Sequence, residues 1–147
     1  MMQKLEQQLC FEVYKAANQF TKLYAKTLQP FGLTYPQYLV ILALGDEDNQ
    51  TTSSLCDRLG LGIGTLNPVL QKLVEKGLLK KEPSKKDKRA SYFSLTEAVK
   101  KLQPAIEQAI VEKLFCFDYL PTEGPILKER LQQLNEFLEM MNKEETV

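Results

Sequence analysis

Residues 51–96 read TTSSLCDRLGLGIGTLNPVLQKLVEKGLLKKEPSKKDKRASYFSLT, and this stretch decides the fold. It starts at residues 51–54 with threonines and serines, the residue types that cap the N-terminus of a helix, and Gly60 ends that short helix. A second helix follows Gly64 and ends at Gly77, with three leucines spaced so that they share one face. The stretch therefore begins with two short helices separated by a glycine-rich turn.

The rest of the stretch predicts a two-stranded hairpin. Residues 78–82 and 90–95 have the pattern of short strands, and the polar run Pro-Ser-Lys-Lys-Asp-Lys-Arg joins them. Upstream, Thr34 is a good N-cap for a helix that has Pro36 in its first turn and extends to Leu44. Three short helices followed by a basic hairpin predict a winged helix-turn-helix, so the expected fold class is mainly α with a small β-wing.

Long amphipathic helices flank this central domain. Residues 4–29 repeat apolar side chains at three- and four-residue steps, and another helix is expected from Thr96 towards residue 117, with Pro104 as a kink. The chain restarts over residues 121–125 into a final helix with coiled-coil spacing. The apolar positions of that helix are Leu127, Leu131, Leu134, Leu138 and Met141.

These apolar stripes need a cover, because an isolated helix with such a stripe requires a partner. The first and last helices of one chain can cover each other, or two chains can pair through them. We favour pairing, because helices of this length overhang a central domain of roughly 60 residues. The expected organisation is an N-terminal dimerisation helix over residues 1–33, a winged helix-turn-helix over 34–95 and C-terminal dimerisation helices over 96–147.

The composition excludes several classes of function. The 147 residues are 44% hydrophobic and 26% charged, as in an ordinary soluble protein. There is no histidine and no Cys-x-x-Cys pair, so a Ser-His-Asp or Cys-His catalytic apparatus is excluded, and we expect no metal and no cofactor. No apolar run approaches the ~20 residues that span a bilayer, and the N-terminus is too polar for a signal peptide, so we expect the cytoplasm.

Charge is segregated along the chain although the net charge is zero. Residues 65–92 carry eight lysines and arginines against three acidic residues, whereas residues 93–147 carry six against ten. A neutral protein with one basic block can place that block against a polyanion while the remainder stays soluble. The alternative is a solvated lysine-rich hairpin without a partner.

The second helix of a helix-turn-helix enters the major groove of double-stranded DNA, and here that helix is about residues 65–76. With Leu66, Leu70 and Leu73 facing inward, polar side chains face outward. Asparagine and glutamine can pair with adenine, and lysines such as Lys76 suit phosphates. Hydroxyl groups at the start of the preceding helix can also bind a phosphate. The cationic tip of the hairpin can reach the minor groove. The predicted DNA-binding residues are Ser53, Ser54, Thr65, Asn67, Pro68, Gln71, Lys72, Lys85, Lys86, Lys88 and Arg89.

Three motifs in this domain resemble the MarR family of winged-helix repressors. They are Leu73-Val-Glu-Lys-Gly77-Leu-Leu, Asp87-Lys-Arg89 at the hairpin tip, and Ser94-Leu-Thr96-Glu, and the helix order fits the family along the whole chain. The resemblance implies a homodimeric repressor, held by its first and last helices, that binds pseudo-palindromic operator DNA. It also implies that Asp87 braces the wing and that Arg89 is the minor-groove residue.

The N-terminal sequence is similar to that of the organic-hydroperoxide-resistance regulators within this family. The matching segments are Gln8-Leu-Cys10-Phe-Glu-Val-Tyr14, Tyr24, Gly32-Leu-Thr-Tyr35-Pro-Gln-Tyr38-Leu-Val and Gly64-Thr-Leu-Asn-Pro68. In those repressors the cysteine that matches Cys10 senses oxidants. The resemblance therefore implies a redox-sensing Cys10, with peroxide or another oxidant as the effector.

Helix geometry limits which tyrosines can support this thiol. Tyr14 lies one turn from Cys10 on the same face of the first helix, whereas Tyr24 is 14 residues further on, roughly 21 Å away at 1.5 Å per residue. Tyr35 lies beyond the same far end, so Tyr24 and Tyr35 can meet only the Cys10 of a second, antiparallel chain. Phenolic hydroxyls donating to the sulfur would favour the thiolate, which peroxide oxidises to sulfenic acid. The alternative is Cys10 as a small core residue, with the tyrosines as interface packing.

The remaining cysteines leave alternatives open. Cys56, beside Leu55, is expected to pack in the core, whereas Cys116 is either an inert core residue or the resolving cysteine that some members of the subfamily carry towards the C-terminal side.

Two other functions compete with redox-switched repression: a repressor released by a small phenolic ligand, with Cys10 not the sensor, and a thiol peroxidase. We do not expect an enzyme, because no arginine precedes residue 58 to activate a peroxide.

Overall fold

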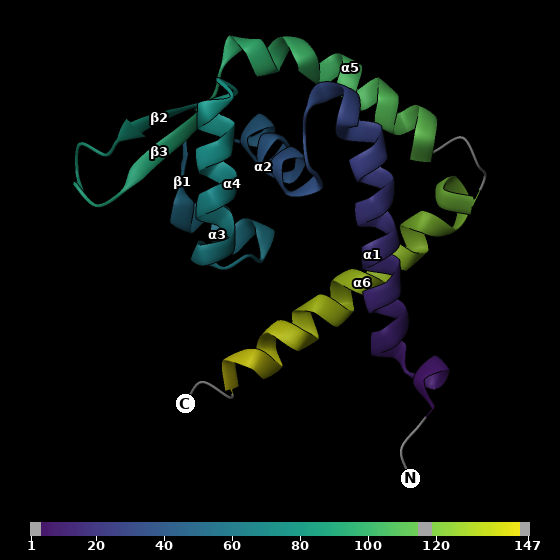
Figure 1. Ribbon diagram of the computed structural model, residues 1–147. Coiled ribbons are helices and arrows are strands. Elements are labelled where there is room, and N and C mark those ends of the chain that lie inside the picture. The colour runs from purple at the N-terminus through teal and green to yellow at the C-terminus, as the bar shows by residue number, and fades with distance from the viewer. Residues whose placement is uncertain (1–3, 115–118, 145–147) are drawn as a thin grey trace. The chain divides into compact units, whose positions relative to one another are not determined.

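The computed structural model describes residues 4–114 and 119–144 (Figure 1). The chain divides into two compact units, Met1–Glu107 and Gln108–Val147. Over the described residues, no helix is both long enough and apolar enough to cross a membrane. The elements follow the predicted order, with one strand added, and the mainly helical fold with a small wing is confirmed.

Helix α2 (Tyr35–Asp46) is the central helix of the first unit. Its N-terminus has the predicted cap: Thr34 Oγ1 accepts from the backbone N–H of Gln37, and Gln37 Oε1 accepts from the backbone N–H of Thr34. The side chains of Val40, Ile41 and Leu44 are at most 1% exposed. These residues form the core against which the next two helices pack.

Helices α3 (Thr52–Leu59) and α4 (Ile63–Glu75) form the predicted helix-turn-helix. The hydroxyl of Thr51 caps α3 by accepting from the backbone N–H of Ser54 at 3.1 Å, and α3 ends at Gly60 in the left-handed conformation, with φ of 65°. On α4 the leucines predicted to face inward are at most 1% exposed: Leu66, Leu70 and Leu73. The predicted cap, glycine stop and buried face are confirmed.

The wing is a three-stranded antiparallel sheet, one strand more than the sequence predicted. Strands β2 (Leu79–Pro83) and β3 (Ser91–Leu95) form the predicted hairpin, with Lys81 opposite Phe93. The additional strand β1 (Gln50–Thr51) pairs with the other edge of β3, giving the order β1-β3-β2. Two residues are too few to show an alternating pattern, so β1 forms only because the fold brings the start of α3 beside the hairpin.

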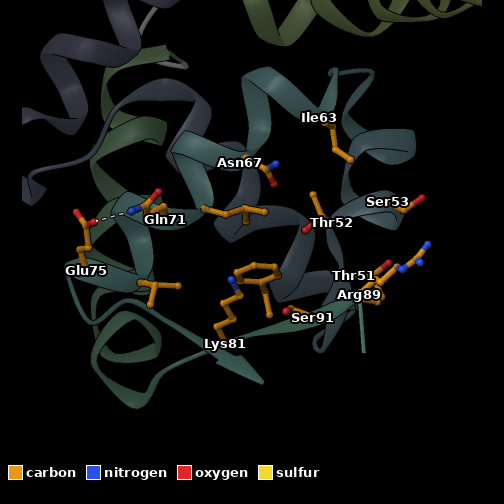
Figure 2. A pocket seen from close by; sticks show the side chains of 14 residues that line it. Thr51, Thr52, Ser53, Ile63, Asn67, Gln71, Glu75, Lys81, Arg89 and Ser91 are labelled. Carbon is orange, nitrogen blue, oxygen red and sulfur yellow. Dashed lines mark hydrogen bonds between the residues drawn. The ribbon is translucent and has the colours of Figure 1, made fainter. Parts of the chain in front are cut away.

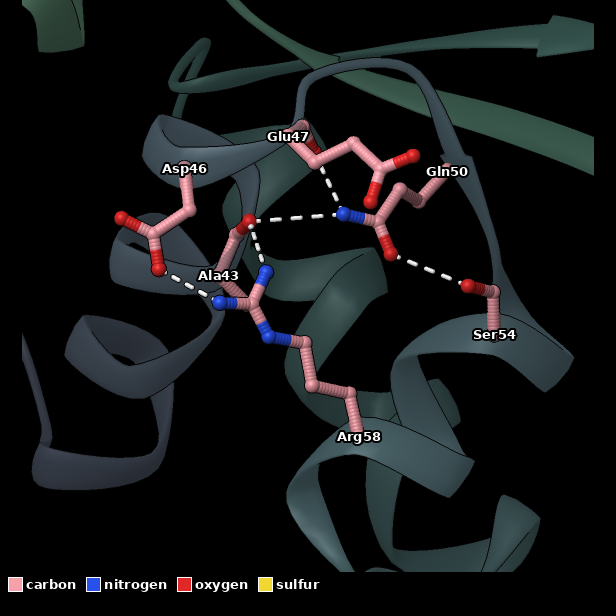
Figure 3. A network of polar contacts seen from close by, with 6 residues as sticks. All are labelled: Ala43, Asp46, Glu47, Gln50, Ser54 and Arg58. Atoms are coloured by element: carbon pink, nitrogen blue, oxygen red, sulfur yellow. Dashed lines mark hydrogen bonds and ion pairs between the residues drawn. The ribbon is translucent and has the colours of Figure 1, made fainter.

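A polar network joins the end of α2 to α3 (Figure 3). The backbone carbonyl of Ala43 accepts from Gln50 Nε2 at 3.4 Å and from Arg58 Nη1 at 2.9 Å, and Arg58 also pairs with the Asp46 carboxylate. Gln50 is 6% exposed, and its Oε1 accepts from the hydroxyl of Ser54 at 3.0 Å. The same carbonyl also accepts from the backbone N–H of Glu47 at the end of α2, so these side chains add two further donors to it and fix α3 against α2.

Helix α1 (Leu9–Leu28) lies between two short 3-10 helices, Leu5–Gln7 and Gln29–Phe31. The sequence predicted one continuous helix over residues 4–29. The structure interrupts it at Gln8, whose backbone is extended, with φ of −89° and ψ of 123°. Gly32, in the left-handed region with φ of 67°, ends the second 3-10 helix and turns the chain towards α2.

The last two helices each contain a proline. Helix α5 (Glu97–Leu114) begins in the first unit and ends in the second, and Pro104 lies inside it. Helix α6 (Tyr119–Glu144) begins before both prolines of its first turns, so the chain restarts earlier than predicted. The predicted end of the fifth helix near residue 117 lies outside the described residues.

Large apolar side chains remain exposed on the terminal helices. On α1, Leu9 is 67% and Phe20 41% exposed. On α6 the exposed apolar residues are Ile126, Leu127, Leu131, Phe137, Leu138, Met140 and Met141. Four of the five positions of the predicted coiled-coil stripe are in this set, and Leu134 is half-buried. An apolar surface of this kind is typical of a protein–protein contact.

Candidate nucleic-acid interface

The outer face of α4 is polar and exposed. Thr65, Asn67, Pro68, Gln71 and Lys72 all lie on it, opposite the buried leucines. Pro68 is the sixth residue of α4 and has no N–H, so it cannot make the helical bond to the carbonyl of Gly64. The first turns of α4 therefore present polar side chains and one backbone carbonyl without its helical donor.

This face borders an open groove of about 880 Å³ between α4, the start of α3 and the wing (Figure 2). Asn67 and Gln71 line it from α4, and Lys81 and Arg89 line it from the hairpin. The remaining lining residues are Thr51, Thr52, Ser53, Ile63, Leu70, Val74, Glu75, Ala90, Ser91 and Phe93. Two cations and several amide or hydroxyl groups thus surround a concave surface that carries a single carboxylate, a composition that suits an anionic polymer.

The two serines predicted to hold a phosphate have different surroundings. Ser54 uses its hydroxyl on Gln50 Oε1 and its backbone N–H on Thr51 Oγ1. Ser53 is exposed and lines the groove. Because both donors of Ser54 are used inside the fold, Ser53 is the stronger candidate for the phosphate contact.

The wing tip is an ordered turn with exposed cations. Ser84 Oγ accepts from the backbone N–H groups of Lys86 and Asp87, each at 3.2 Å, and Asp87 Oδ1 accepts from the backbone N–H of Arg89 at 2.9 Å. The Asp87 carboxylate thus holds the backbone that carries Arg89, which is the geometry that a bracing role requires. The cationic side chains of the tip are exposed: Lys85, Lys86, Lys88 and Arg89.

Gln71 on α4 and Lys76, which directly follows α4, both have partners within the chain. Gln71 Nε2 donates to Glu75 Oε1 at 3.2 Å, so a base contact by Gln71 requires this exposed bond to exchange. Lys76, which the sequence assigned to phosphates, instead donates to the carbonyl of Gly32 and to Gln37 Oε1. A phosphate contact by Lys76 would require these bonds to exchange, so its role at DNA stays a prediction.

Ile63 and Lys81 are among the groove residues that the sequence did not predict. Ile63, the first residue of α4, is 60% exposed and lines the groove next to Asn67. Lys81 lies on β2 with its ammonium 5.9 Å from the ring centroid of Phe93. An apolar residue directly before Gly64 was a signal for Ile63, since the leucine face of α4 begins only at Leu66.

The thiol of Cys10 is exposed on α1, with its Sγ 3.8 Å from Gln8 Oε1. Tyr14, one turn along the same helix, is 67% exposed. Cys56 is half-buried on α3, and the predicted resolving cysteine, Cys116, lies outside the described residues. No group of side chains that could hold a metal ion occurs among residues 4–114 and 119–144.

Three tyrosines cluster at the other end of α1. The rings of Tyr24 and Tyr35 stack with centroids 4.2 Å apart, and those of Tyr24 and Tyr38 with centroids 5.8 Å apart. Burial, followed by the neighbouring Tyr35 and Tyr38, raises the pKa of Tyr24 to about 12, and burial also raises the pKa values of Tyr35 and Tyr38. All three phenols are therefore neutral donors at physiological pH.

Comparisons with known proteins agree with this architecture. A model of the MarR family matches residues 31–90. The organic hydroperoxide resistance transcriptional regulator of Bacillus subtilis (strain 168) is 39% identical over 94 residues, 64% of this chain and 64% of that one, so the alignment spans less than two thirds of either. The HTH-type transcriptional regulator MgrA of Staphylococcus aureus is 30% identical over 135 residues, 91% of this chain and 87% of that one.

Among solved structures, AbfR of Staphylococcus epidermidis superimposes with a TM-score of 0.76 at 36% identity, covering 92% of this chain and 94% of that one. AbfR structures have also been solved bound to DNA in reduced and overoxidised forms, and with a disulfide formed. The alignment with MgrA over most of both chains, the family match to the central domain and the shared fold support one assignment. The chain belongs to the MarR family of winged-helix transcriptional regulators.

Proposed function

We propose that this protein is a cytoplasmic, homodimeric repressor that binds pseudo-palindromic operator DNA and releases it when Cys10 is oxidised. Residues 34–95 bind the DNA, and residues 1–33 and 96–147 pair the two chains. The observation that carries the proposal is the exposed Cys10 on a helix whose far end holds a cluster of neutral tyrosines. When two chains pair in antiparallel fashion, the tyrosine cluster of one chain lies beside Cys10 of the other.

DNA binding is assigned to the groove and its rim. The exposed face of α4 enters the major groove, where Asn67 and Gln71 contact adenines. Thr65 contacts a phosphate or a thymine methyl, and Lys72 contacts a phosphate of the DNA backbone. The wing tip follows the backbone and places Arg89 in the minor groove. Two such domains in a dimer reach half-sites about one DNA turn apart, which is why the operator is pseudo-palindromic.

Redox sensing is assigned to Cys10. It is exposed, as a thiol that reacts with peroxide must be. Tyr24 and Tyr35 cannot reach it within one chain, because 14 residues of continuous helix separate Cys10 from Tyr24. In an antiparallel pair their hydroxyls donate to the partner's Cys10 and favour its thiolate. The names of the Bacillus subtilis relative and of the AbfR structures support oxidant sensing.

The chemical step is a two-electron oxidation of sulfur by a hydroperoxide. The Cys10 thiolate attacks the terminal oxygen of ROOH, the S–O bond forms, the O–O bond breaks, and the alkoxide leaves as ROH after taking a proton. The product is a sulfenic acid. If the Cys116 thiol then attacks this sulfur, a disulfide forms and water leaves, and the two chains become covalently joined.

The test is DNA release by peroxide, measured by fluorescence anisotropy on a duplex selected by the reduced protein from a random-sequence pool. Wild type is expected to release the duplex after cumene hydroperoxide, whereas Cys10→Ser binds equally well before and after. The matched control is Cys56→Ser, which should respond like wild type. If Cys10→Ser still releases the duplex, the sensor is not Cys10, and release by salicylate alone would indicate the phenolic-ligand alternative.

Non-reducing electrophoresis after the same treatment identifies the oxidised product. A covalent dimer that is lost in both Cys10→Ser and Cys116→Ser indicates the disulfide between chains. A monomer band that still fails to bind DNA indicates a sulfenic acid or a small-thiol adduct on Cys10. Mass spectrometry before and after reduction distinguishes these last two products.

A further inference from the structure

Lys76, which directly follows α4, joins the end of that helix to a distant part of the chain. Its Nζ donates to the carbonyl of Gly32 at 2.5 Å and to Gln37 Oε1 at 3.1 Å, acceptors 44 and 39 residues earlier in the sequence. Gly32 lies in the turn between α1 and α2, and Gln37 lies in the first turn of α2. One side chain therefore connects the proposed recognition helix to the α1–α2 turn (residues 29–34).

The side-chain oxygen of Gln37 has Lys76 as one of its two hydrogen-bond donors. Gln37 is 3% exposed, and its Oε1 already accepts from the backbone N–H of Thr34 at 3.1 Å as part of the helix cap. Lys76 supplies the second donor to this oxygen, and a cationic donor makes the bond stronger than a neutral one. Without the ammonium, a buried acceptor loses one of its two partners, so the contact holds α4 against the turn.

The same turn leads directly into the tyrosine cluster. Tyr35 follows Thr34, is the first residue of α2 and stacks on Tyr24. Gly32, Thr34 and Tyr35 line one shallow pocket beside α1. A displacement of Tyr35 therefore moves backbone that is within three residues of both acceptors of Lys76.

We infer that Lys76 is a positioning residue that transmits the geometry of the α1–α2 turn to the recognition helix. The inference rests on the proposed function, in which the partner's Cys10 reacts beside Tyr35. While the turn is in place, Lys76 holds the C-terminal end of α4 in the DNA-binding position. When an oxidised sulfur displaces Tyr35, Gly32 and Gln37 move, the two hydrogen bonds are lost, and α4 is no longer held.

The test is a double-mutant cycle on the reduced, full-length dimer, with affinity for the selected duplex as the measurement. Tyr35→Ala is expected to weaken binding about tenfold in the wild-type background but by less than about twofold in the Lys76→Met background, because the connection is already absent. Lys101→Met, an exposed lysine of α5, is the matched control and should leave the effect of Tyr35→Ala unchanged. Lys76→Arg keeps a cationic donor and should preserve most of the coupling.

The salt dependence separates positioning from direct DNA contact. Lys76→Met should weaken binding without changing the slope of log affinity against log salt, whereas loss of a phosphate contact lowers that slope by about one unit per contact. Additive effects of Lys76→Met and Tyr35→Ala, or a lowered slope, would overturn the inference. A wild type that binds no duplex overturns the proposed function and the inference together. Binding without release by peroxide overturns Cys10 sensing and the oxidation step of the inference, but not the coupling of Tyr35 to Lys76, because the cycle is measured on reduced protein.

Discussion

The winged helix-turn-helix and helix α6 differ in where their apolar side chains find partners. In the first, the leucines of α4 are at most 1% exposed, and Arg58 and Gln50 close the end of α2. On α6, Ile126 and Phe137 are 59% and 52% exposed. The comparison teaches that the winged domain buries its apolar side chains within its own chain, whereas α6 leaves apolar side chains exposed, and we propose that a second chain covers them.

The largest expected effect is loss of the dimer. Leu131→Glu combined with Leu138→Glu places two charges on the apolar stripe of α6, and sedimentation should then show monomer. DNA affinity should fall more than about 100-fold, because the second half-site is no longer held in place. The matched control, Gln132→Glu with Gln133→Glu, adds the same charge beside the stripe and should leave the dimer intact. A dimer that survives the leucine changes would remove α6 from the interface.

Within the winged domain, the effect on stability should follow burial. Leu70→Ala removes a side chain that is 1% exposed and should lower the free energy of unfolding by about 2–5 kcal/mol. Ile63→Ala, on the same helix but 60% exposed, should change it by about 0.5 kcal/mol or less. Urea unfolding followed by circular dichroism measures both free energies. Equal losses in the two variants would contradict the conclusion that the winged domain forms its core from a single chain.

The wing should contribute to DNA binding through charge alone. Arg89→Ala should weaken binding to every duplex and lower the salt slope by about one unit per contact, which is two per dimer. Gln71→Ala is the matched comparison, because it should change the preference at particular base pairs by about 1–3 kcal/mol and leave the slope unchanged. An unchanged affinity and slope for Arg89→Ala would show that the wing does not contact DNA.

The smallest effect concerns the tyrosine cluster. Because burial raises the pKa of Tyr24 to about 12 from 10.0, folding favours its neutral form. The resulting stability is fully present below pH 10 and is lost as the pH rises through about 12; since Tyr24 is only partly buried, we expect about 1 kcal/mol. Ultraviolet titration should show one phenol ionising near pH 12 in the wild type, and this step should be absent in Tyr24→Phe and present in Tyr14→Phe.

Local signals in the sequence determined most of the elements. The Thr34 and Thr51 caps, the Gly60 stop, the leucine face of α4 and the hairpin all depend on residues within a few positions of one another. Helix caps, glycine conformations and side-chain periodicity act over one or two turns, so a single sequence carries them. The candidate DNA-binding residues of α4 followed from the same periodicity, because the inward leucines define the outward face of that helix.

Long-range contacts were decided only by the tertiary structure. Strand β1 and the hydrogen-bond partners of Lys76 have no local signature, since each depends on chain segments brought together from distant positions. A lysine on a helix is equally able to meet a phosphate or a backbone carbonyl, and only the position of the α1–α2 turn selects the carbonyl. The sequence by itself thus determined which elements form and which faces they bury. The tertiary structure decided which polar side chains serve the fold and which remain available for DNA, because buried acceptors must be satisfied wherever the folded chain places them.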